Sequence, residues 1–375
     1  MALALETQRA LPGSGARVRR TPRKPAPALQ VPRVSVIIVN YRLWEETARL
    51  VGELRASPRV RSGEVEIVVV DNHSPLHPVV KRMRRWPGVS LRRWGRNRGF
   101  AHAVNEGCRL SRGQWLLLLN PDISIAPDFL DRVLSLSDRL AEEEPRAGVV
   151  GFRLRNSDGS RQLSSGPFPT LAQTLLRLAL PRTRRKYHFV QARRRRRVPW
   201  VTGCCMLLRR GCVEELGGLD RDFFLYYEDV DLCRRARARG WSVWFEPKIK
   251  AVHHHPLHTR PVPAFMRLLT RHALLTYAAK HWPAWQLRLL AALVEMEARL
   301  RKRLADRNQD VESGKMFGQL RALAVDFRRG QTAAARKRLE QTIRREERTG
   351  ASNPGTCLPT RDHEPCRTPI ELIAE

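Results

Sequence analysis

The chain reads Val34-Ser35-Val36-Ile37-Ile38-Val39-Asn40 at the point where we expect ordered structure to begin. A short, continuous apolar run of this kind is typical of a strand buried on both faces of a sheet. Similar runs at 66–71 and 114–119 end in Asp71 and in Asn120-Pro121-Asp122. Helical patterns are expected at 44–55, 76–85, 99–110 and 127–140, and a further strand at 89–93. Strands that alternate with helices predict an α/β fold with a mostly parallel sheet.

Polar residues follow these strands at their carboxyl ends. Ligands of open parallel sheets bind at the carboxyl ends of the strands. Asn40, Asp71 and Asn120–Asp122 all occupy such positions, so we expect them to meet at one site. Each of them alone has an ordinary alternative as a turn or helix-cap residue, but their convergence is far more specific.

The pattern changes after about residue 150. Residues 155–166 suggest a hairpin or loop, 170–180 a short helix, 198–203, 243–245 and 249–252 short strands, and 262–348 a helical region with Leu-rich and Arg-rich faces. The predicted organisation is a disordered basic tail at 1–32, an α/β domain at 33–260, a helical segment at 261–348 and a flexible tail at 349–375.

The composition is strongly basic, with 375 residues, a formal net charge of +32 and five consecutive Arg residues at 193–197. This charge indicates a polyanionic partner, such as nucleic acid, an anionic membrane surface or a phosphorylated substrate. The seven cysteines include no CxxC pair, and buried free thiols are expected for Cys204 and Cys205. No window approaches 18 uninterrupted apolar residues, so we expect no membrane span and a cytoplasmic protein.

An acidic stretch, Phe224-Leu225-Tyr226-Tyr227-Glu228-Asp229-Val230-Asp231, follows an aromatic run. If a helix begins near Tyr227, Glu228 and Asp231 share one face and Asp229 turns away from both. Acids are favoured in the first turn of any helix by the helix dipole. Acids behind aromatic residues that could wall a pocket can also serve as bases. The stretch alone leaves both interpretations open.

Two further motifs suggest ligand chemistry. The stretch from Arg96 to Gly107 opens a helix with a Gly in its first turn, which suits phosphate binding, but GxGxxG is absent, which argues against a nicotinamide dehydrogenase. His253-His254-His255 follows a strand, where alternate side chains point to opposite faces, so the three cannot all bind one ion. One imidazole could complete a metal site with Asp122, with a packing or surface role as the alternative.

Taken in order, these motifs resemble glycosyltransferase family 2, and most of all its bacterial rhamnosyltransferase branch. The resemblance covers about residues 34–260 and is carried by VSVIIVNY, VVVDNHS, RNRGFAHAVNEG, LLLLNPD, VTGCCMLLRR, GGLDRDFFLYYEDVDLCRRARARGW and AVHHH. It implies a GT-A fold, which is a nucleotide-binding αβα sandwich with a mixed sheet. It also implies inverting transfer of a sugar from a nucleotide-diphosphate donor.

The resemblance assigns roles to particular residues. It implies that Asp71 contacts the base of the donor nucleotide and that Asn97, Gly99 and Asn105 shape the donor pocket. Asn40 and Asn120, by their position at strand ends, and Arg96, at the start of a helix, are also expected to bind the donor. It implies that Mg²⁺ or Mn²⁺ is bound by Asp122 and His253, with His254 as the alternative. It further implies that Asp229 is the general base, that Glu228 beside it holds the acceptor or the geometry of the site, and that Gly203 opens the acceptor-side loop. Asp231 is also expected on the acceptor side.

The chain departs from the family pattern in two places. Asn120 replaces the first acid of the family's DxD-type motif, so the metal would be held by fewer charges. The Q-x-x-R-W element of processive members is missing after Asp231, which favours transfer of one sugar per encounter. The best-matching donor is dTDP-rhamnose, with another hexosyl donor as the alternative. The expected acceptor is a glycan or polyprenyl-linked glycan of the cell envelope.

Other functions stay open at this level. A basic nucleic-acid-binding protein would explain the Arg runs, although acids at the strand ends would repel phosphates, so nucleic acid is not the expected partner. A non-catalytic transferase-like scaffold is a second alternative. The helical segment from Arg267 to Leu304 is expected on the inner face of the plasma membrane, because Trp282, Trp285, Leu287, Leu289 and Leu290 lie among Arg residues. Ordinary packing against the domain is the alternative.

Overall fold

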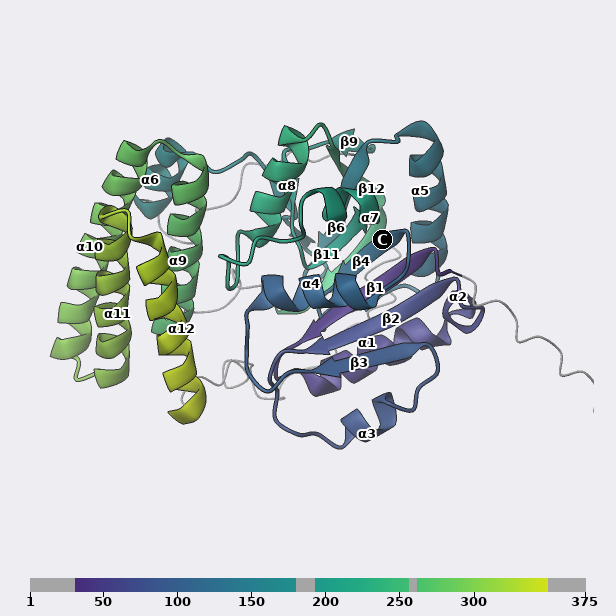
Figure 1. Cartoon of the computed structure of the whole chain (residues 1–375), viewed down its shortest axis with the longest axis horizontal. Coiled ribbons are helices and arrows are strands. Elements are labelled where there is room, and N and C mark those ends of the chain that lie inside the picture. Colours follow the sequence, from purple (N-terminus) through teal and green to yellow (C-terminus); the bar gives the residue numbers. More distant parts are fainter. Residues whose placement is uncertain (1–30, 180–192, 256–261, 350–375) are drawn as a thin grey trace, which may run out of the picture. The chain divides into compact units, whose positions relative to one another are not determined.

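The computed structural model describes residues 31–179, 193–255 and 262–349 (Figure 1). The predicted basic tail, apart from residues 31 and 32, and the predicted tail beyond residue 349 lie outside the described residues. The main sheet has the strand order β3-β2-β1-β4-β11-β6-β12-β5. Its strands are β1 (Val34–Asn40), β2 (Val65–Asp71), β3 (Val89–Arg93), β4 (Trp115–Leu119), β5 (Ile123–Ile125), β6 (Ala147–Arg155), β11 (Cys205–Arg209) and β12 (Ser242–His253).

Short strands extend this sheet at its sides. The two-residue strand β7 (Arg161–Gln162) pairs with β6 and forms the expected hairpin, while β9 (Arg196–Arg197) pairs with β12. A separate ribbon joins β8 (Ser165–Gly166) to β10 (Trp200–Val201). The expected strand at 198–203 is therefore shorter than predicted.

The sheet is mixed, as predicted. Strands β1 to β4 run parallel, β11 is antiparallel to both β4 and β6, and β12 is parallel to β6. Asn40 is in register with Asp71, and Ile38 with Leu119, so β1, β2 and β4 end side by side. We call this line of strand ends the carboxyl edge of the sheet. Because Cys205 pairs with Leu119, β11 begins at the same edge.

Helices cover both faces of the sheet (Figure 1). Alternate residues of each buried strand contribute to two separate hydrophobic clusters, as the pleat of a strand requires. One face packs against α1 (Trp44–Ala56), α2 (Pro58–Arg61), α3 (Val79–Met83) and α5 (Phe129–Glu143). The other packs against α4 (Phe100–Leu110), α7 (Arg210–Glu215) and α8 (Glu228–Ala238). The predicted α/β sandwich is confirmed.

The central strands β6 and β11 were not expected from the sequence, and β12 is one strand where two were predicted. Two glycines interrupt the apolar pattern of β6, yet packing requires both. A Cβ on Gly151 would lie 2.4 Å from Val201 Cβ, and one on Gly148 would lie 2.7 Å from Cys212 Sγ. These glycines weaken the strand signal while allowing close approach of neighbouring elements.

The helical segment builds a third hydrophobic cluster of its own. The segment comprises α9 (Ala264–His281), α10 (Ala284–Arg307), α11 (Val311–Arg328) and α12 (Thr332–Thr349), and α6 (Leu171–Ala179) joins the cluster through Leu171. Leu287 and Leu290, which were expected at a membrane, are instead buried in this cluster. Trp282 is half-buried, and its indole N–H donates to the Pro169 carbonyl (3.1 Å). Of the five residues named, only Trp285 and Leu289 are exposed.

Two expectations about membranes and thiols can be compared with the described ranges. None of the helices there combines the length and apolarity needed to cross a bilayer. The described cysteines, Cys108, Cys204, Cys205, Cys212 and Cys233, are all buried free thiols. The prediction for Cys204 and Cys205 is therefore confirmed.

Candidate functional site

The carboxyl edge begins with a network around Asp71. The side-chain amide of Asn40 donates to Asp71 Oδ1 (2.8 Å) and to Ser74 Oγ (3.0 Å). Arg93 Nε donates to Asp71 Oδ2 at 2.9 Å. Asp71 is fully buried, and protein groups bind both of its carboxylate oxygens. Asn40 and Asp71 are thus brought together as predicted, and Ser74 and Arg93 join them without having been foreseen.

Asn97 connects this network to the start of α4. Its Oδ1 accepts hydrogen bonds from Asn72 Nδ2 (2.7 Å) and from the Gly99 N–H (2.9 Å). Gly99 has φ +88°, and a Cβ there would lie 2.7 Å from the Phe224 carbonyl oxygen. The next N–H, that of Phe100, donates to this same oxygen at 2.7 Å. The loop before α4 therefore touches the aromatic stretch that precedes α8.

Arg96 and Asn105 have different surroundings from these residues. Arg96 is exposed. The Asn105 side chain forms two hydrogen bonds with the backbone of Leu219. Its Nδ2 donates to the Leu219 carbonyl, and its Oδ1 accepts from the Leu219 N–H, both at 2.8 Å. In this arrangement Asn105 braces the turn at Gly218 and Leu219.

The aromatic stretch ends in two residues with left-handed backbone. Tyr226 has φ 74° and Tyr227 has φ 66°. Non-glycine residues in this region cost on the order of 1–3 kcal/mol each and cluster at functional sites. Helix α8 begins at the next residue, Glu228. The strained turn thus sets the direction in which the first helical turn presents its acids.

Asp229 turns away from the other two acids, as the helical spacing predicts, and it reaches the carboxyl edge of the sheet at Gly203. Its Oδ2 accepts a hydrogen bond from the Gly203 N–H, and its Oδ1 accepts one from the N–H of the next residue, Val230, both at 2.8 Å. A Cβ on Gly203 would lie 3.3 Å from Asp229 Cβ, so glycine permits this approach. Burial raises the pKa of the Asp229 carboxyl, and the two backbone donors offset part of that effect. A carboxylate of raised basicity is suited to accept a proton.

Glu228 and Asp231 occupy the opposite side of this turn. Glu228 is 5% exposed, and its Oε2 is buried without a partner in the described part of the chain. Burial, with repulsion from Asp229, raises the pKa of Glu228 well above its usual value. Asp231 is fully buried but satisfied, since it accepts from Arg235 Nε (2.6 Å) and contacts His281 Nε2 (2.8 Å). Asp231 therefore ties α8 to α9.

The candidate metal position lies just past β4. His253 Nε2 is 3.3 Å from Asp122 Oδ2, and His253 Nδ1 lies 2.8 Å from the side-chain nitrogen of Gln162. Burial acts to raise the pKa of the Asp122 carboxyl, but the interactions with His253 outweigh it and hold the pKa below its usual value. Asn120 Oδ1 is buried and has no partner among the described residues.

His254 faces elsewhere. Its Nε2 contacts Ser124 Oγ (2.8 Å) and its Nδ1 contacts Ser157 Oγ (3.1 Å). Burial lowers the pKa of His254 to about 4, so it is a neutral packing residue. Of the two candidates for the metal position, the structure thus places His253 beside Asp122.

One short segment joins the metal position to the candidate base. The Cys204 carbonyl accepts from the Asn120 N–H (2.8 Å), while the preceding N–H, of Gly203, bonds Asp229. Burial raises the pKa of the Cys204 thiol to about 12, and the charges of Asp122 and Asp229 both add to that rise. Gly203–Cys204 therefore links Asp229 to the turn that carries Asp122.

A glutamate from the C-terminal helix also reaches this edge. The Glu347 side chain interacts with Tyr41 and Asn97, and it lies near Arg42 and His73. Burial raises the pKa of both Glu347 and Tyr41. No local signal in the sequence could have identified this contact, because α12 is separated from β1 by almost the whole chain.

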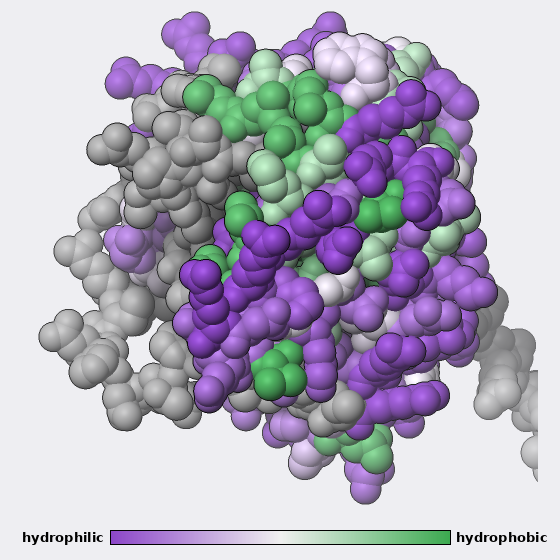
Figure 2. Space-filling view, turned by 90° about the vertical axis from the view of Figure 1, so that its left-hand side faces the viewer, coloured by the Kyte–Doolittle hydropathy of each residue, from purple (hydrophilic) through white to green (hydrophobic). Residues whose placement is uncertain are grey.

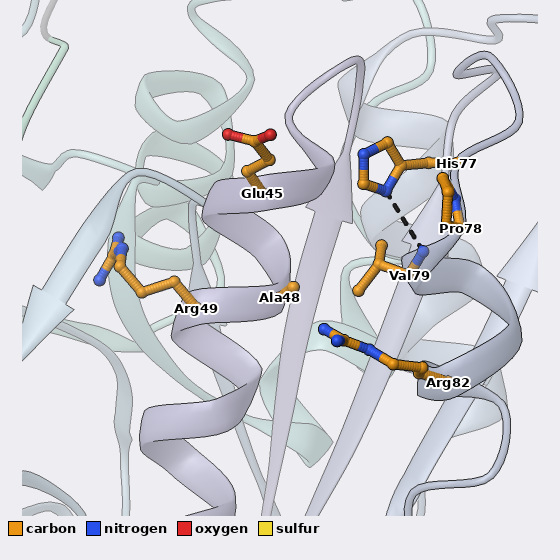
Figure 3. Close-up of a pocket in the computed structure, with 7 residues that line it drawn as sticks. All are labelled: Glu45, Ala48, Arg49, His77, Pro78, Val79 and Arg82. Atoms are coloured by element: carbon orange, nitrogen blue, oxygen red, sulfur yellow. Dashed lines mark hydrogen bonds between the residues drawn. The ribbon is translucent and has the colours of Figure 1, made fainter. Parts of the chain in front are cut away.

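A separate pocket of about 460 Å³ lies between α1 and the loop that leads into α3. Figure 3 shows its lining residues, including His77, whose Nδ1 accepts from the Val79 N–H at 3.3 Å. It contains none of the predicted site residues. One lining residue, Arg49, reaches away from it and donates to Ser124 Oγ and the Ile123 carbonyl, both at 2.9 Å. Arg49 thereby supports the turn that carries Asp122.

Comparison with known proteins identifies the family to which the sequence belongs. The model of the glycosyltransferase-like family 2 matches residues 32–273, which is more than half of the chain. The chain is 30% identical over 247 residues to the N-acetylglucosaminyl-diphospho-decaprenol L-rhamnosyltransferase of Mycobacterium tuberculosis, covering 61% of this chain and 78% of that protein. It is 26% identical over 232 residues to the rhamnosyltransferase WbbL of Escherichia coli, covering 59% of this chain and 84% of that protein.

A solved structure of S. aureus TarS in complex with UDP is 14% identical, with a TM-score of 0.45, and the match covers 85% of this chain and 92% of that chain. The family match extends over all the strands of the main sheet and over every predicted site residue. The chain is therefore a glycosyltransferase that belongs to family 2.

Proposed function

We propose that this glycosyltransferase moves a single rhamnose from dTDP-rhamnose to a glycan or polyprenyl-linked acceptor, with inversion at the anomeric carbon. The observation that supports the proposal is the pair of bonds made by Gly203–Cys204. The Gly203 N–H donates to Asp229, and the Cys204 carbonyl accepts from Asn120, in the turn that carries Asp122. The relatives named as rhamnosyltransferases support the choice of sugar, and the decaprenol-linked name of the mycobacterial relative supports a lipid-linked acceptor.

On the donor side, the nucleotide would lie along the ends of β1, β2 and β3. Asn40 and Arg93 hold Asp71 in place, and Asn72 holds Asn97. These contacts fix the loop before binding, which lowers the ordering cost of ligand capture. Exposed Arg96, close to the N-terminus of α4, is available for a phosphate.

The residues present fit a divalent cation. Asp122 supplies a carboxylate, and Asn120 Oδ1 is an oxygen that lacks any described partner. Within the described ranges no group of three or more His, Cys, Asp or Glu side chains is placed to hold a metal. Mg²⁺ commonly uses one or two carboxylates together with substrate phosphates, so Asp122, Asn120 and His253 would suffice. When bound, Mg²⁺ or Mn²⁺ would stabilise the charge of the departing diphosphate.

On the acceptor side, Asp229 would take the proton of the acceptor hydroxyl. The freed oxygen then forms a bond to the anomeric carbon from the face opposite the leaving group, and the bond from that carbon to the diphosphate oxygen breaks. The Gly203 and Val230 N–H groups hold the Asp229 carboxylate in one orientation throughout. A base fixed in this way loses no orientation at the moment of reaction.

The test of this assignment is Asp229→Asn. We expect the transfer rate to fall by about 10²–10⁴-fold, the usual contribution of a general base, while nucleotide binding stays close to that of the wild type. Asp158→Asn, in an exposed loop, is the matched control and should be fully active. Near-normal turnover of Asp229→Asn would reject the assignment, and a wild type that binds donor but transfers no sugar would support the scaffold alternative.

A further inference from the structure

Helix α10 has a second apolar face that the fold does not use. Trp285, Leu289, Met296, Leu300 and Leu304 are 61%, 41%, 54%, 52% and 56% exposed. They recur at intervals of four, seven, four and four residues, which keeps them on one side of an α-helix. We call these five residues the α10 stripe. Figure 2 shows hydrophobic side chains gathered on this face of the molecule and bordered by hydrophilic ones.

The stripe is not a poorly packed part of the core. The opposite side of α10 is buried through Leu287, Leu290, Val294 and Ala298, with exposures of 0–8%. These residues pack into the hydrophobic cluster of the helical segment. Burial in the fold therefore explains one apolar face and leaves the other in contact with solvent. Contiguous exposed apolar surface of this kind marks an interaction site.

Positive charge is interleaved with the stripe. Arg288, Arg299, Arg303 and Arg307 are exposed and lie three or four residues from its members. Arg299 pairs with Glu295. The other three form no ion pair with any residue in the described ranges. The stripe thus combines exposed apolar side chains with neighbouring Arg residues, three of which form no ion pair within the described residues.

This combination selects one kind of partner. A second copy of the same stripe would bring Arg against Arg, which opposes association. Nucleic acid offers phosphates but no apolar phase for Trp285 and the leucines. A bilayer with anionic lipids offers both, because Arg stems can lie along the apolar surface while their guanidinium groups reach lipid phosphates.

We propose that the α10 stripe docks this enzyme on an anionic phospholipid surface, with Trp285, Leu289, Met296, Leu300 and Leu304 inserted at the headgroup boundary. This inference deepens the proposed function, because a polyprenyl-linked acceptor resides in a membrane. Its physical basis is the α10 surface alone, so it can fail or succeed independently of the choice of sugar.

Flotation of the full chain with vesicles tests the proposal. Wild-type protein should float with phosphatidylglycerol-containing vesicles at low salt and much less with neutral phosphatidylcholine vesicles. Leu289→Ser/Leu300→Ser should lower the partition coefficient by roughly 10- to 100-fold, because two leucines lose their apolar insertion. Arg303→Gln/Arg307→Gln should lower it roughly fivefold per Arg and weaken the salt dependence.

The control is Val31→Ser/Leu76→Ser, which removes two apolar side chains that lie away from α10 and are more exposed than Leu289 and Leu300. It should float like the wild type, and all variants should keep the wild-type melting temperature. Unchanged flotation of Leu289→Ser/Leu300→Ser would overturn the proposal. So would a wild-type dimer in sedimentation that this variant converts to monomer.

A nucleotide-induced rise in melting temperature, measured on the same variants, keeps the two proposals distinguishable. If wild-type protein floats but no nucleotide sugar stabilises it, the proposed function fails and the docking surface stands. If a nucleotide sugar stabilises the protein but the stripe variants float unchanged, the docking surface fails and the proposed function stands.

Discussion

Glu228 has an environment that fits the chemistry of a carboxylate poorly. Its carboxyl group is 5% exposed, lies next to Asp229, and has one oxygen without a described partner. Burial and repulsion hold its pKa in the folded protein well above the value of about 4.3 expected in the unfolded chain. The folded protein therefore binds more protons than the unfolded chain as pH rises above that value. Stability contributed by this group is lost as pH increases.

Replacing this carboxyl should stabilise the fold at neutral pH. We expect Glu228→Gln to raise the melting temperature at neutral pH, with the gain shrinking to nothing as pH falls toward about 4. Thermal unfolding followed by circular dichroism across that range measures it. Glu142→Gln, on an exposed position of α5, is the control and should show no such dependence. A loss of stability at neutral pH would mean that Glu228 is ionised and partnered in the fold.

Individual site residues differ in how far the sequence could predict them. The placement of Asp229 away from Glu228 and Asp231 follows from helical spacing. The choice between His253 and His254 does not, because the partners Asp122, Ser124 and Ser157 come from other elements. Asp231 was expected on the acceptor side, and its contact with His281 depends on how α9 packs, which periodicity does not reveal.

Among whole elements, the buried parallel strands were the easiest to predict. Strands β1, β2 and β4 are uninterrupted apolar runs with a polar residue at the end, so both their existence and their convergence follow from the pattern. Strand β6 escaped prediction because packing against Val201 and Cys212 requires glycine at two of its positions. In the sequence those glycines look like the end of a strand, because the residues that pack against them, Val201 and Cys212, are distant in the chain.

Helix α12 adds a negative charge to the nucleotide side of the site. Because Glu347 lies beside Arg42, it opposes the approach of a diphosphate to that guanidinium group. We expect Glu347→Gln to tighten binding of a nucleoside diphosphate by about 2–5-fold, the size of one screened charge interaction near a surface. Isothermal titration calorimetry measures this change.

The neighbouring residue provides the control for that prediction. Glu346 lies near Glu312 and Lys315 instead, so Glu346→Gln should bind like the wild type. The difference in nucleoside diphosphate affinity between Glu347→Gln and the wild type should become smaller as pH falls through the raised pKa of Glu347. The wild-type carboxyl is then neutral as well. Weaker binding by Glu347→Gln would mean that this carboxylate contacts the nucleotide directly.

At the scale of the molecule, three parts of the chain contribute to the proposed site. The first half supplies the strand ends with Asp71 and Asp122, the middle supplies Gly203 and Asp229, and the C-terminal helices supply His281 and Glu347. The helical segment also carries the α10 stripe. Ligand binding at the site should therefore stabilise the whole described chain rather than one element, since each part holds a contact that the others need.

Thermal unfolding of the full protein with nucleotide sugars tests this picture. A ligand at about 100 times its Kd stabilises the native state by about 2.7 kcal/mol, which corresponds to several degrees for a chain of this size. We expect the largest rise with dTDP-rhamnose plus Mn²⁺, and a smaller rise without the metal. Asp122→Asn should abolish the additional rise in melting temperature that Mn²⁺ causes and keep the rise caused by dTDP-rhamnose alone. Asp158→Asn should keep both rises. If Mn²⁺ still raises the melting temperature of Asp122→Asn, the cation does not bind at Asp122. If every nucleotide sugar raises the melting temperature equally, the assignment of rhamnose is wrong.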